Sequence, residues 1–316
     1  MKISFVIPCY RSERTIEGVV MEIKSTVASR SQVGYEVVMV SDHSPDGVYS
    51  VIERLCREDP VHCRGLELAR NFGQPSALMA GFSRVSGDVV FCLDDDGQAP
   101  VDAIYRVVDK LVDGGYDVVY GEYPHKRHSF FRNLGSDVNH LMAVWLIGKP
   151  KTIRTTSFFA MRRFVAEEMK RYTGPFPYIG GIIFRTTKNI GAVAVDHRNR
   201  TEGESGYTLT KLVRLMMNGF TAFSVKPLRL ASIAGAFCAS AGFAFAVYTV
   251  IAKLLNPANV AIGYSSLMSA ILFVGGMIML MLGLIGEYVG RIYISLNNSP
   301  QYVISNETMS PKEEMR

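Results

Sequence analysis

Two long runs without a charged residue lie in the C-terminal third of the chain, and they constrain its fold more than any other feature. They cover 230–252 and 254–286 and are separated only by Lys253. A hydrocarbon core of about 30 Å needs about 20 apolar helical residues. The runs therefore predict two membrane-spanning helices at about 227–252 and 263–287, within a hairpin domain at 226–290. The alternative is a buried hairpin in a soluble core.

Basic residues flank this hairpin on the side of its two ends. Lys226 and Arg229 stand at the start of the first run, and Arg291 follows the second, whereas the connecting side has only Lys253. The positive-inside rule then predicts a multi-pass protein with both ends in the cytoplasm. We expect 1–225 to form a cytoplasmic domain and 291–316 a cytoplasmic tail. The initial run ISFVIPCY is short and interrupted by a proline, which favours a β-strand over a signal peptide.

Composition narrows the classes of partner. Lys and Arg total 34 against 29 for Asp and Glu, and a net charge of +5 is too small to predict nucleic-acid binding. It suits an anionic membrane surface or a phosphorylated substrate. The five cysteines form no C-x-x-C pair and have no metal-ligand spacing, so we interpret them as inert thiols in a reducing compartment.

Strand-like runs alternate with helical patterns through the first half of the chain. This order predicts an α/β fold: a Rossmann-like, mostly parallel sheet with helices on both faces. In such sheets the ligand site lies beyond the carboxyl ends of the strands. No G-x-G-x-x-G follows the first strand and no P-loop motif occurs, which counts against a dinucleotide enzyme or a P-loop NTPase. The expected strands are KISFVIPCY, YEVVMVSD, GLELAR, DVVFCLDDD and DVVYGEY.

Three consecutive aspartates end the fourth of these strands. Asp94 and Asp96 are two residues apart on an extended chain and project to the same side. With the amide oxygen of Gln98 they offer hard oxygen ligands to Mg²⁺ or Mn²⁺ and leave room for phosphates. The alternative is a solvated loop or a helix N-cap.

Six motifs, in order, resemble those of the bacterial polyisoprenyl-phosphate glycosyltransferases. These are membrane members of glycosyltransferase family two, related to dolichol-phosphate mannose synthase and including glucosyl and aminoarabinosyl transferases of undecaprenyl phosphate. The resemblance runs from Ile3 to about Tyr302. The motifs are VIPCYRSE, SDHSPDG, LARNFGQPSALMAGF, LDDDGQAP, HRNRTEGESGYTLTKL and GLIGEYVGRIY.

The resemblance implies roles for residues in these motifs. Asp42 would accept a hydrogen bond from the nucleotide base, and Arg200 with Ser205 would hold phosphate oxygens. The implied metal ligands on the donor diphosphate are Asp94, Asp96 and Gln98. The implied nucleotide-binding residues are Pro8, Tyr10, Glu13, Asp42, Gln74, Asp94 and Asp95.

The resemblance also implies the partners. We expect a UDP-sugar donor, an undecaprenyl phosphate acceptor, a Mg²⁺ or Mn²⁺ cofactor, the lipid bilayer of a bacterial inner membrane, and a homo-oligomer, a tetramer in the family. The transferred sugar stays open between glucose, N-acetylglucosamine and a modified aminoarabinose.

Positive side chains are needed to hold two phosphorylated substrates together. Arg127, Arg132 and Arg200 are candidates for the acceptor side, because an arginine fork binds phosphate oxygens bidentately. With Asp96 and Ser205 they complete the candidate catalytic set. The alternative for the segment HKRHSFFR is a solvated basic loop.

The chain departs from the family pattern at three places. Relatives usually carry two aspartates and a glycine where this chain has Ser41, Asp42 and His43, and many have a lysine at Gly206. The segment TTSFFAMRR lacks an aspartate that many relatives have. The missing aspartate bears on the need for a general base. A lipid phosphate has a second pKa near 6 and arrives largely ionised, so it can attack without a general base. One direct displacement then inverts the configuration of the sugar.

Two further segments, near 129–148 and 208–224, place apolar residues at helical spacing beside basic ones. They predict amphipathic helices in the membrane interface, and the alternative is that they pack on the sheet.

Three functions compete: transfer of one sugar to a polyprenyl phosphate, processive polysaccharide synthesis, and a non-catalytic copy of the fold. A processive synthase is expected to have a Q-x-x-R-W motif, but Trp145 is the only tryptophan and no such motif surrounds it. A degenerate copy would have lost its acidic ligands, which are present. Single-sugar transfer is therefore favoured.

Overall fold

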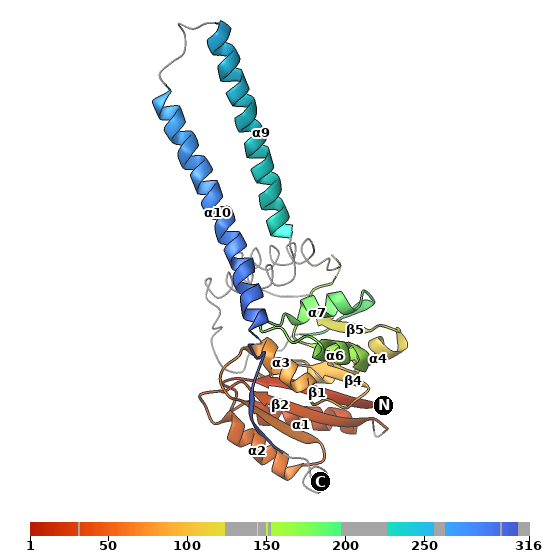
Figure 1. Ribbon diagram of the computed structural model, residues 1–316. Coiled ribbons are helices and arrows are strands. Elements are labelled where there is room, and N and C mark those ends of the chain that lie inside the picture. The colour runs from red at the N-terminus through yellow and green to blue at the C-terminus, as the bar shows by residue number, and fades with distance from the viewer. Residues whose placement is uncertain are drawn as a thin grey trace. The chain divides into compact units, whose positions relative to one another are not determined.

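The computed structural model describes residues 1–30, 32–123, 144, 150, 153–196, 226–255, 263–297 and 299–308. The chain divides into two compact units (Figure 1). The first unit comprises Met1–Met216 and Asn298–Arg316, and the second comprises Met217–Asn297. The chain therefore leaves the first unit, builds the second and returns to the first.

Within the described residues, one eight-stranded sheet organises the first unit, in the order β7-β5-β6-β4-β1-β2-β3-β8. The pairs β1–β2, β1–β4, β2–β3 and β5–β7 are parallel, whereas β6 and β8 run antiparallel to their neighbours. This confirms the predicted mostly parallel sheet, and the five expected runs form β1 to β5. The bounds are β1 Lys2–Cys9, β2 Gly34–Ser41, β3 Cys63–Leu68, β4 Val89–Cys92, β5 Val118–Glu122, β6 Phe159–Arg162, β7 Ile190–Ala194 and β8 Ile304–Glu307.

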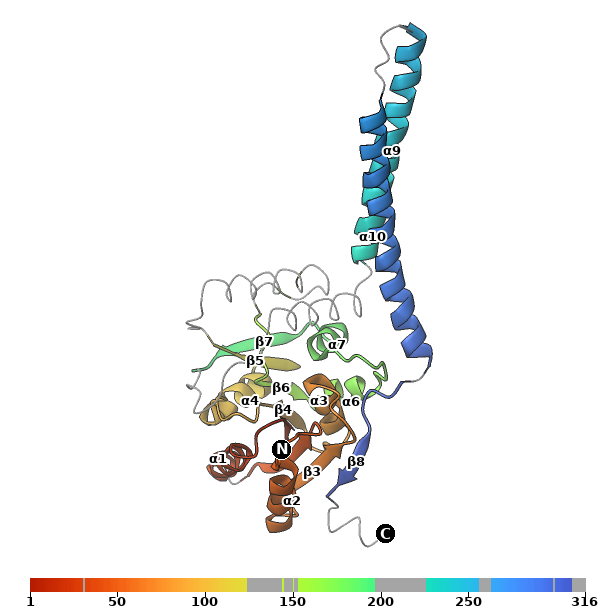
Figure 2. The ribbon, with the colours of Figure 1, turned by 90° about the vertical axis from the view of Figure 1, so that its left-hand side faces the viewer.

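Helices cover both faces of the sheet (Figure 2). Buried residues of α1, α2 and α4 join one core with the sheet, and α3 packs on β1 and β2 from the other side, where it also contacts α6. The bounds are α1 Ile16–Ala28, α2 Val48–Glu58, α3 Gln74–Phe82, η1 Val101–Ala103, α4 Ile104–Asp113, α6 Arg163–Lys170 and α7 Ile179–Thr186.

The central strand β1 shows how the sequence fills both cores. Phe5 and Ile7 are fully buried in the core with α1, whereas Val6 between them points to α3. There Gly81 of α3 lies so close that a Cβ on it would collide with Val6. Because both faces of β1 are buried, its sequence is apolar without alternation. Full burial of each such apolar side chain stabilises the folded state by about 1.5–3 kcal/mol.

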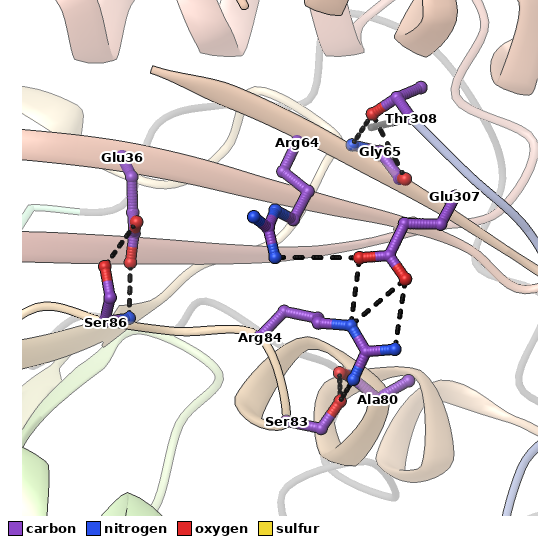
Figure 3. A network of polar contacts seen from close by, with 9 residues as sticks. All are labelled: Glu36, Arg64, Gly65, Ala80, Ser83, Arg84, Ser86, Glu307 and Thr308. Atoms are coloured by element: carbon purple, nitrogen blue, oxygen red, sulfur yellow. Dashed lines mark hydrogen bonds and ion pairs between the residues drawn. The ribbon is translucent and has the colours of Figure 1, made fainter. Parts of the chain in front are cut away.

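The last strand, β8, closes the edge of the sheet beyond β3 (Figure 3). The Arg84 guanidinium donates to the Glu307 carboxylate at 2.9 Å from Nε and 3.0 Å from Nη2, and Arg64 lies 3.6 Å from the same carboxylate. The amide of Gly65 donates to the Thr308 hydroxyl at 2.7 Å. The segment expected as a tail, 291–316, thus contains the end of a helix and a strand of the sheet.

The second unit contains two long helices, α9 (Lys226–Leu255) and α10 (Tyr264–Leu296). The expected spans at 227–252 and 263–287 fall within them almost completely. Among the described residues, Phe273–Leu296 is long and apolar enough to cross a membrane, and Ala231–Phe245 is a shorter apolar stretch. The helices contact each other where Gly235 faces the side chain of Met281.

The amphipathic helices expected near 129–148 and 208–224 lie outside the described residues, apart from position 144.

Candidate active site

The loop after β1 is joined to the loop after β4. The amide of Tyr10 donates to the carboxylate of Asp95 at 2.9 Å, and the Thr15 hydroxyl donates to the main-chain oxygen of Asp95 at 2.6 Å. Burial raises the pKa of the Asp95 carboxyl to about 6, although the Tyr10 amide opposes this shift. Asp95 therefore fixes the loop that begins with the predicted nucleotide-binding residue Tyr10.

The loop after β1 is also joined to the loop after β2. The amide of Arg11 donates to the Ser44 hydroxyl at 2.7 Å. The amide of Glu13 donates to Asp46 at 3.0 Å, and the Glu13 carboxylate accepts the amide of Gly47 at 3.1 Å. These bonds place the ends of β1 and β2 side by side, as parallel strands require.

Two residues in these loops have a left-handed backbone that is unusual without glycine. Arg11 has φ of 58° and His43 has φ of 48°, and no other non-glycine residue in the described ranges has a positive φ. A left-handed backbone favours glycine, so His43 adopts it at an energetic cost. Such backbone strain clusters at functional sites.

Asp42, the predicted base-binding residue, directly follows β2 and is buried. Its two carboxylate oxygens accept the amides of Phe72 and Gly73 at 2.7 and 2.8 Å. Burial raises the pKa of the Asp42 carboxyl, against the opposing effect of the two amides. Asp42 thus holds the turn before α3, which the sequence did not indicate.

Asp94, a predicted metal ligand, is held from two sides. The Gln74 side-chain amide donates to one carboxylate oxygen at 2.9 Å, and the Ser157 hydroxyl donates to the other. Both donors are neutral, so these two bonds orient the carboxylate without cancelling its charge.

Asp96 and Tyr123 lie near Asp94, and we call Asp94, Asp96 and Tyr123 the cluster. One Asp96 oxygen accepts the main-chain amide of Gln98 at 3.0 Å, which closes a tight turn after β4. Burial, together with the charges of Asp94 and Asp96, raises the pKa of Tyr123 to about 12. Tyr123 directly follows β5 and lies within electrostatic reach of both carboxylates.

The donor set of this cluster fits a hard divalent cation. Within the described ranges no group of three or more His, Cys, Asp or Glu side chains is placed to hold a metal. Mg²⁺, however, is usually held by one or two carboxylates together with substrate phosphates. Asp94 and Asp96 provide two carboxylates after one strand, and the side chains of Gln74 and Ser157 orient the first of them.

The structure brings most of the predicted site residues together at the carboxyl ends of the parallel strands. These are Tyr10, Glu13, Asp42 and the Asp94–Asp96 triplet in the loops after the strands, and Gln74 at the start of α3, which are joined by hydrogen bonds. Pro8 is buried within β1 opposite Val40. Arg127, Arg132, Arg200 and Ser205 lie outside the described residues.

Sequence reasoning missed Ser157 and Tyr123. Ser157 lies in TTSFFAMRR, a segment that stood out only for an aspartate it lacks. Ser157 lies two residues before β6 and Asp94 two residues after β4, so their contact follows from the pairing of these strands, which the local sequence did not indicate.

Comparisons with known proteins identify the family of the chain. Residues 4–170 match glycosyl transferase family 2, and residues 226–292 match the GtrB C-terminal hairpin. An undecaprenyl-phosphate 4-deoxy-4-formamido-L-arabinose transferase from Yersinia enterocolitica is 33% identical over 304 residues, covering 96% of this chain and 92% of that protein. An uncharacterized glycosyltransferase from Bacillus subtilis is 32% identical over 302 residues, covering 95% and 92%.

A solved structure shares the fold of about two thirds of the chain. The glucosyl-3-phosphoglycerate synthase of Mycobacterium tuberculosis in complex with UDP aligns with a TM-score of 0.51 and 18% identity, covering 68% of this chain and 76% of that one. This likeness supports the Rossmann-like transferase fold. By its matched family and its relatives along nearly the whole chain, the protein belongs to glycosyl transferase family 2 and is a glycosyltransferase with the GtrB-type hairpin.

Proposed function

We propose that this glycosyltransferase moves one sugar from a nucleotide-sugar, a UDP-sugar by family expectation, to a polyprenyl phosphate such as undecaprenyl phosphate. The observation that carries the proposal is the match along 96% of the chain to a relative named as an undecaprenyl-phosphate sugar transferase. The site supports it, because the carboxylates lie at the carboxyl ends of the strands, where sheets of this kind bind nucleotides.

The proposed cofactor is Mg²⁺ or Mn²⁺, held by Asp94, Asp96 and the side-chain oxygen of Gln98. When bound, such an ion stabilises the negative charge of the departing nucleoside diphosphate. Asp94 is pre-oriented for this role by Gln74 and Ser157. Pre-orientation matters because a carboxylate held in one geometry loses less entropy on binding the ion.

The acceptor side needs no general base. A phosphate monoester is largely ionised at neutral pH and attacks the sugar as its own nucleophile. A single displacement inverts the anomeric centre. Arg127, Arg132, Arg200 and Ser205 are proposed to hold the phosphate oxygens of the two substrates.

The proposed location is a bacterial inner membrane, with α9 and α10 spanning it and both ends of the chain cytoplasmic. Large apolar side chains along both helices are exposed, Phe237 at 75% and Phe273 at 62% among them. Large apolar side chains exposed repeatedly along such long helices favour contact with lipid or with another protein.

The test uses the full-length protein in detergent or nanodiscs with undecaprenyl phosphate, Mn²⁺ and a panel of UDP-sugars. We expect one labelled sugar on the lipid, with inverted configuration. A polymeric product would support the processive alternative, and no transfer from any donor would contradict the proposal. Omission of metal should stop the reaction.

A further inference from the structure

We propose that Asp42 is a positioning residue for the metal site: it holds the turn at Phe72 and Gly73, and this turn places Gln74 so that its amide orients Asp94. The inference rests on the proposed function, because it gives Asp94 the role of a metal ligand. It adds to the base-binding role of Asp42, which the sequence resemblance implied, a structural connection between the end of β2 and the end of β4.

The first link is a clamp between Asp42 and two consecutive amides. The two oxygens of this carboxylate accept separate hydrogen bonds, from Phe72 at 2.7 Å and from Gly73 at 2.8 Å. The carboxylate is buried, with 3% of the residue exposed, so water does not readily replace these bonds. Bonds from an amide to a charged acceptor are among the strong ones.

The second link is the turn itself, which needs holding. Gly73 has φ of 91° and ψ of 153°, a combination open essentially only to glycine. Its carbonyl oxygen accepts the amides of Ser76 at 3.0 Å and Ala77 at 3.1 Å, so the turn starts α3. The residues of α3 from Ser76 to Phe82 are all buried. The direction in which α3 begins is therefore fixed by packing and by the Asp42 clamp.

The third link joins α3 to the metal site. Gln74 is the first residue of α3, and its side-chain amide donates to one oxygen of Asp94 at 2.9 Å. The other oxygen of Asp94 accepts a hydrogen bond from Ser157, which lies two residues before β6 and is not part of the turn at Phe72 and Gly73. Two separate arms thus orient one carboxylate, and only the Gln74 arm passes through Asp42.

The direct test is the Asp42→Asn variant, which keeps the size of the side chain and replaces one acceptor oxygen with an NH₂ group. We expect amide hydrogen exchange at Phe72 and Gly73 to accelerate by about tenfold or more. Affinity for Mn²⁺ alone, followed by the paramagnetic resonance of the free ion, should fall by about 10- to 100-fold, as expected when a group that orients a metal ligand is lost. Unchanged exchange or unchanged Mn²⁺ affinity would overturn the proposal.

A double-mutant cycle tests the order of the links. Asp42→Asn combined with Gln74→Ala should weaken Mn²⁺ binding no more than Gln74→Ala alone, because both act through one arm. Asp42→Asn combined with Ser157→Ala should show the product of the two single effects, because the arms are separate. Independent effects of Asp42 and Gln74 would contradict the inference.

Two further variants separate the explanations. Asp46→Asn changes a neighbouring carboxylate that accepts the amide of Glu13 and has no link to the turn, so Mn²⁺ affinity should stay unchanged. If Asp42→Asn fails to fold, Gly73→Ala disturbs the turn without altering a charge, and the same loss of Mn²⁺ affinity is expected. If Asp42 serves the base alone, Asp42→Asn weakens binding of uridine and leaves Mn²⁺ binding intact, which contradicts the inference.

Failure of the unaltered protein to bind Mn²⁺ would contradict the metal site of the proposed function. The exchange rates at Phe72 and Gly73 would still decide whether Asp42 holds the turn.

Discussion

Ser157 lies opposite Asp94 because of the register between two antiparallel strands. The pairing of β4 with β6 sets Cys92 opposite Phe159, and two further steps along both chains bring Asp94 opposite Ser157, whose hydroxyl donates to the carboxylate. The contact is thus fixed by the sheet, although the residues are 63 positions apart in the sequence.

Removal of this hydroxyl should weaken the metal site. We expect Ser157→Ala to lower the affinity for Mn²⁺ by about 10- to 100-fold, because the Asp94 carboxylate loses a donor that orients it. Titration of Mn²⁺ against the purified protein measures the effect. Ser157→Thr keeps a hydroxyl and should restore most of the affinity. The Thr156 hydroxyl donates to the carbonyls of Gly121 and Phe158, so Thr156→Val should affect stability and leave metal affinity unchanged.

Asp96→Asn should abolish sugar transfer and leave the fold intact. The change removes a charged ligand from the cluster and not from an apolar core, so the circular dichroism spectrum and the thermal midpoint should match those of the original protein. The assay is transfer to lipid phosphate at saturating Mg²⁺ or Mn²⁺. Asp113→Asn, at an exposed position ending α4, serves as the control. Retention of most activity in Asp96→Asn would exclude this residue as an essential ligand.

The ion pairs that Glu307 of β8 forms with Arg84 and Arg64 should stabilise the folded protein. Glu307 receives hydrogen bonds from Arg84 and lies near Arg64, and both partners of the Arg84 pair are partly buried, at 35% and 25% side-chain exposure. We expect Glu307→Gln to lower the free energy of unfolding by about 1 kcal/mol, near the upper end for partly exposed pairs. Glu168→Gln breaks the exposed pair with Arg171 and should change the free energy of unfolding by about a few tenths of a kcal/mol at most. Thermal unfolding in detergent compares the two variants. Equal effects would show that the Glu307 pairs contribute no more to stability than an exposed ion pair.

Acid should weaken the first unit partly through Glu36. Its carboxylate accepts bonds from Lys2 at 2.6 Å, from the Ser86 amide at 2.6 Å and from the Ser86 hydroxyl at 2.8 Å (Figure 3 shows the Ser86 bonds). Burial opposes ionisation, but these bonds outweigh it and lower the pKa of Glu36 in the folded protein. The resulting stability is present above the unfolded pKa of about 4.3 and is lost as pH falls through the lower folded value.

The measurement is the thermal midpoint of the original protein and of Glu36→Gln between pH 7 and pH 3. We expect the variant to be less stable at pH 7 and to lose less stability on acidification. Parallel curves for the two proteins would show that Glu36 does not contribute to acid unfolding.

His43→Gly should raise the thermal midpoint. The left-handed backbone at φ of 48° costs a residue with a Cβ roughly 1–2 kcal/mol, part of which glycine loses again through the greater freedom of its unfolded chain. We therefore expect a net gain of about 0.5–1 kcal/mol. His43→Ala keeps the Cβ and should show no such gain. A midpoint that rises equally in both variants would assign the effect to the imidazole and not to the backbone.

The sequence was sufficient for those parts of the fold that depend on local patterns. Strands β1 to β5 are apolar runs between polar loops, and the carboxylates at Asp94 and Asp96 follow such a run directly. Buried parallel strands combine strong local preference with strong burial, so that pattern and tertiary structure agree.

The parts that were not predictable depend on distant pairing. The segment ISNE of β8 has no apolar alternation, and its strand conformation comes from pairing with β3, with Thr308 bonded to Gly65 across 243 positions. The contacts of Ser157 and Asp42 arise in the same way. A carboxylate at a strand end indicates a polar site, but which donors reach it is decided by register and by the turn of a remote loop.

The β8 pairing also has a consequence for the order in which the protein is made. A ribosome completes β3 early, then synthesises α9 and α10, and only afterwards releases 304–307. Until then the outer edge of β3 presents unpaired amides and carbonyls, among them the Gly65 groups that later bind Thr308. Such an open edge pairs readily with other extended chains. The nascent protein is therefore most exposed to aggregation during translation of its hairpin, and any delay at that stage lengthens the exposure.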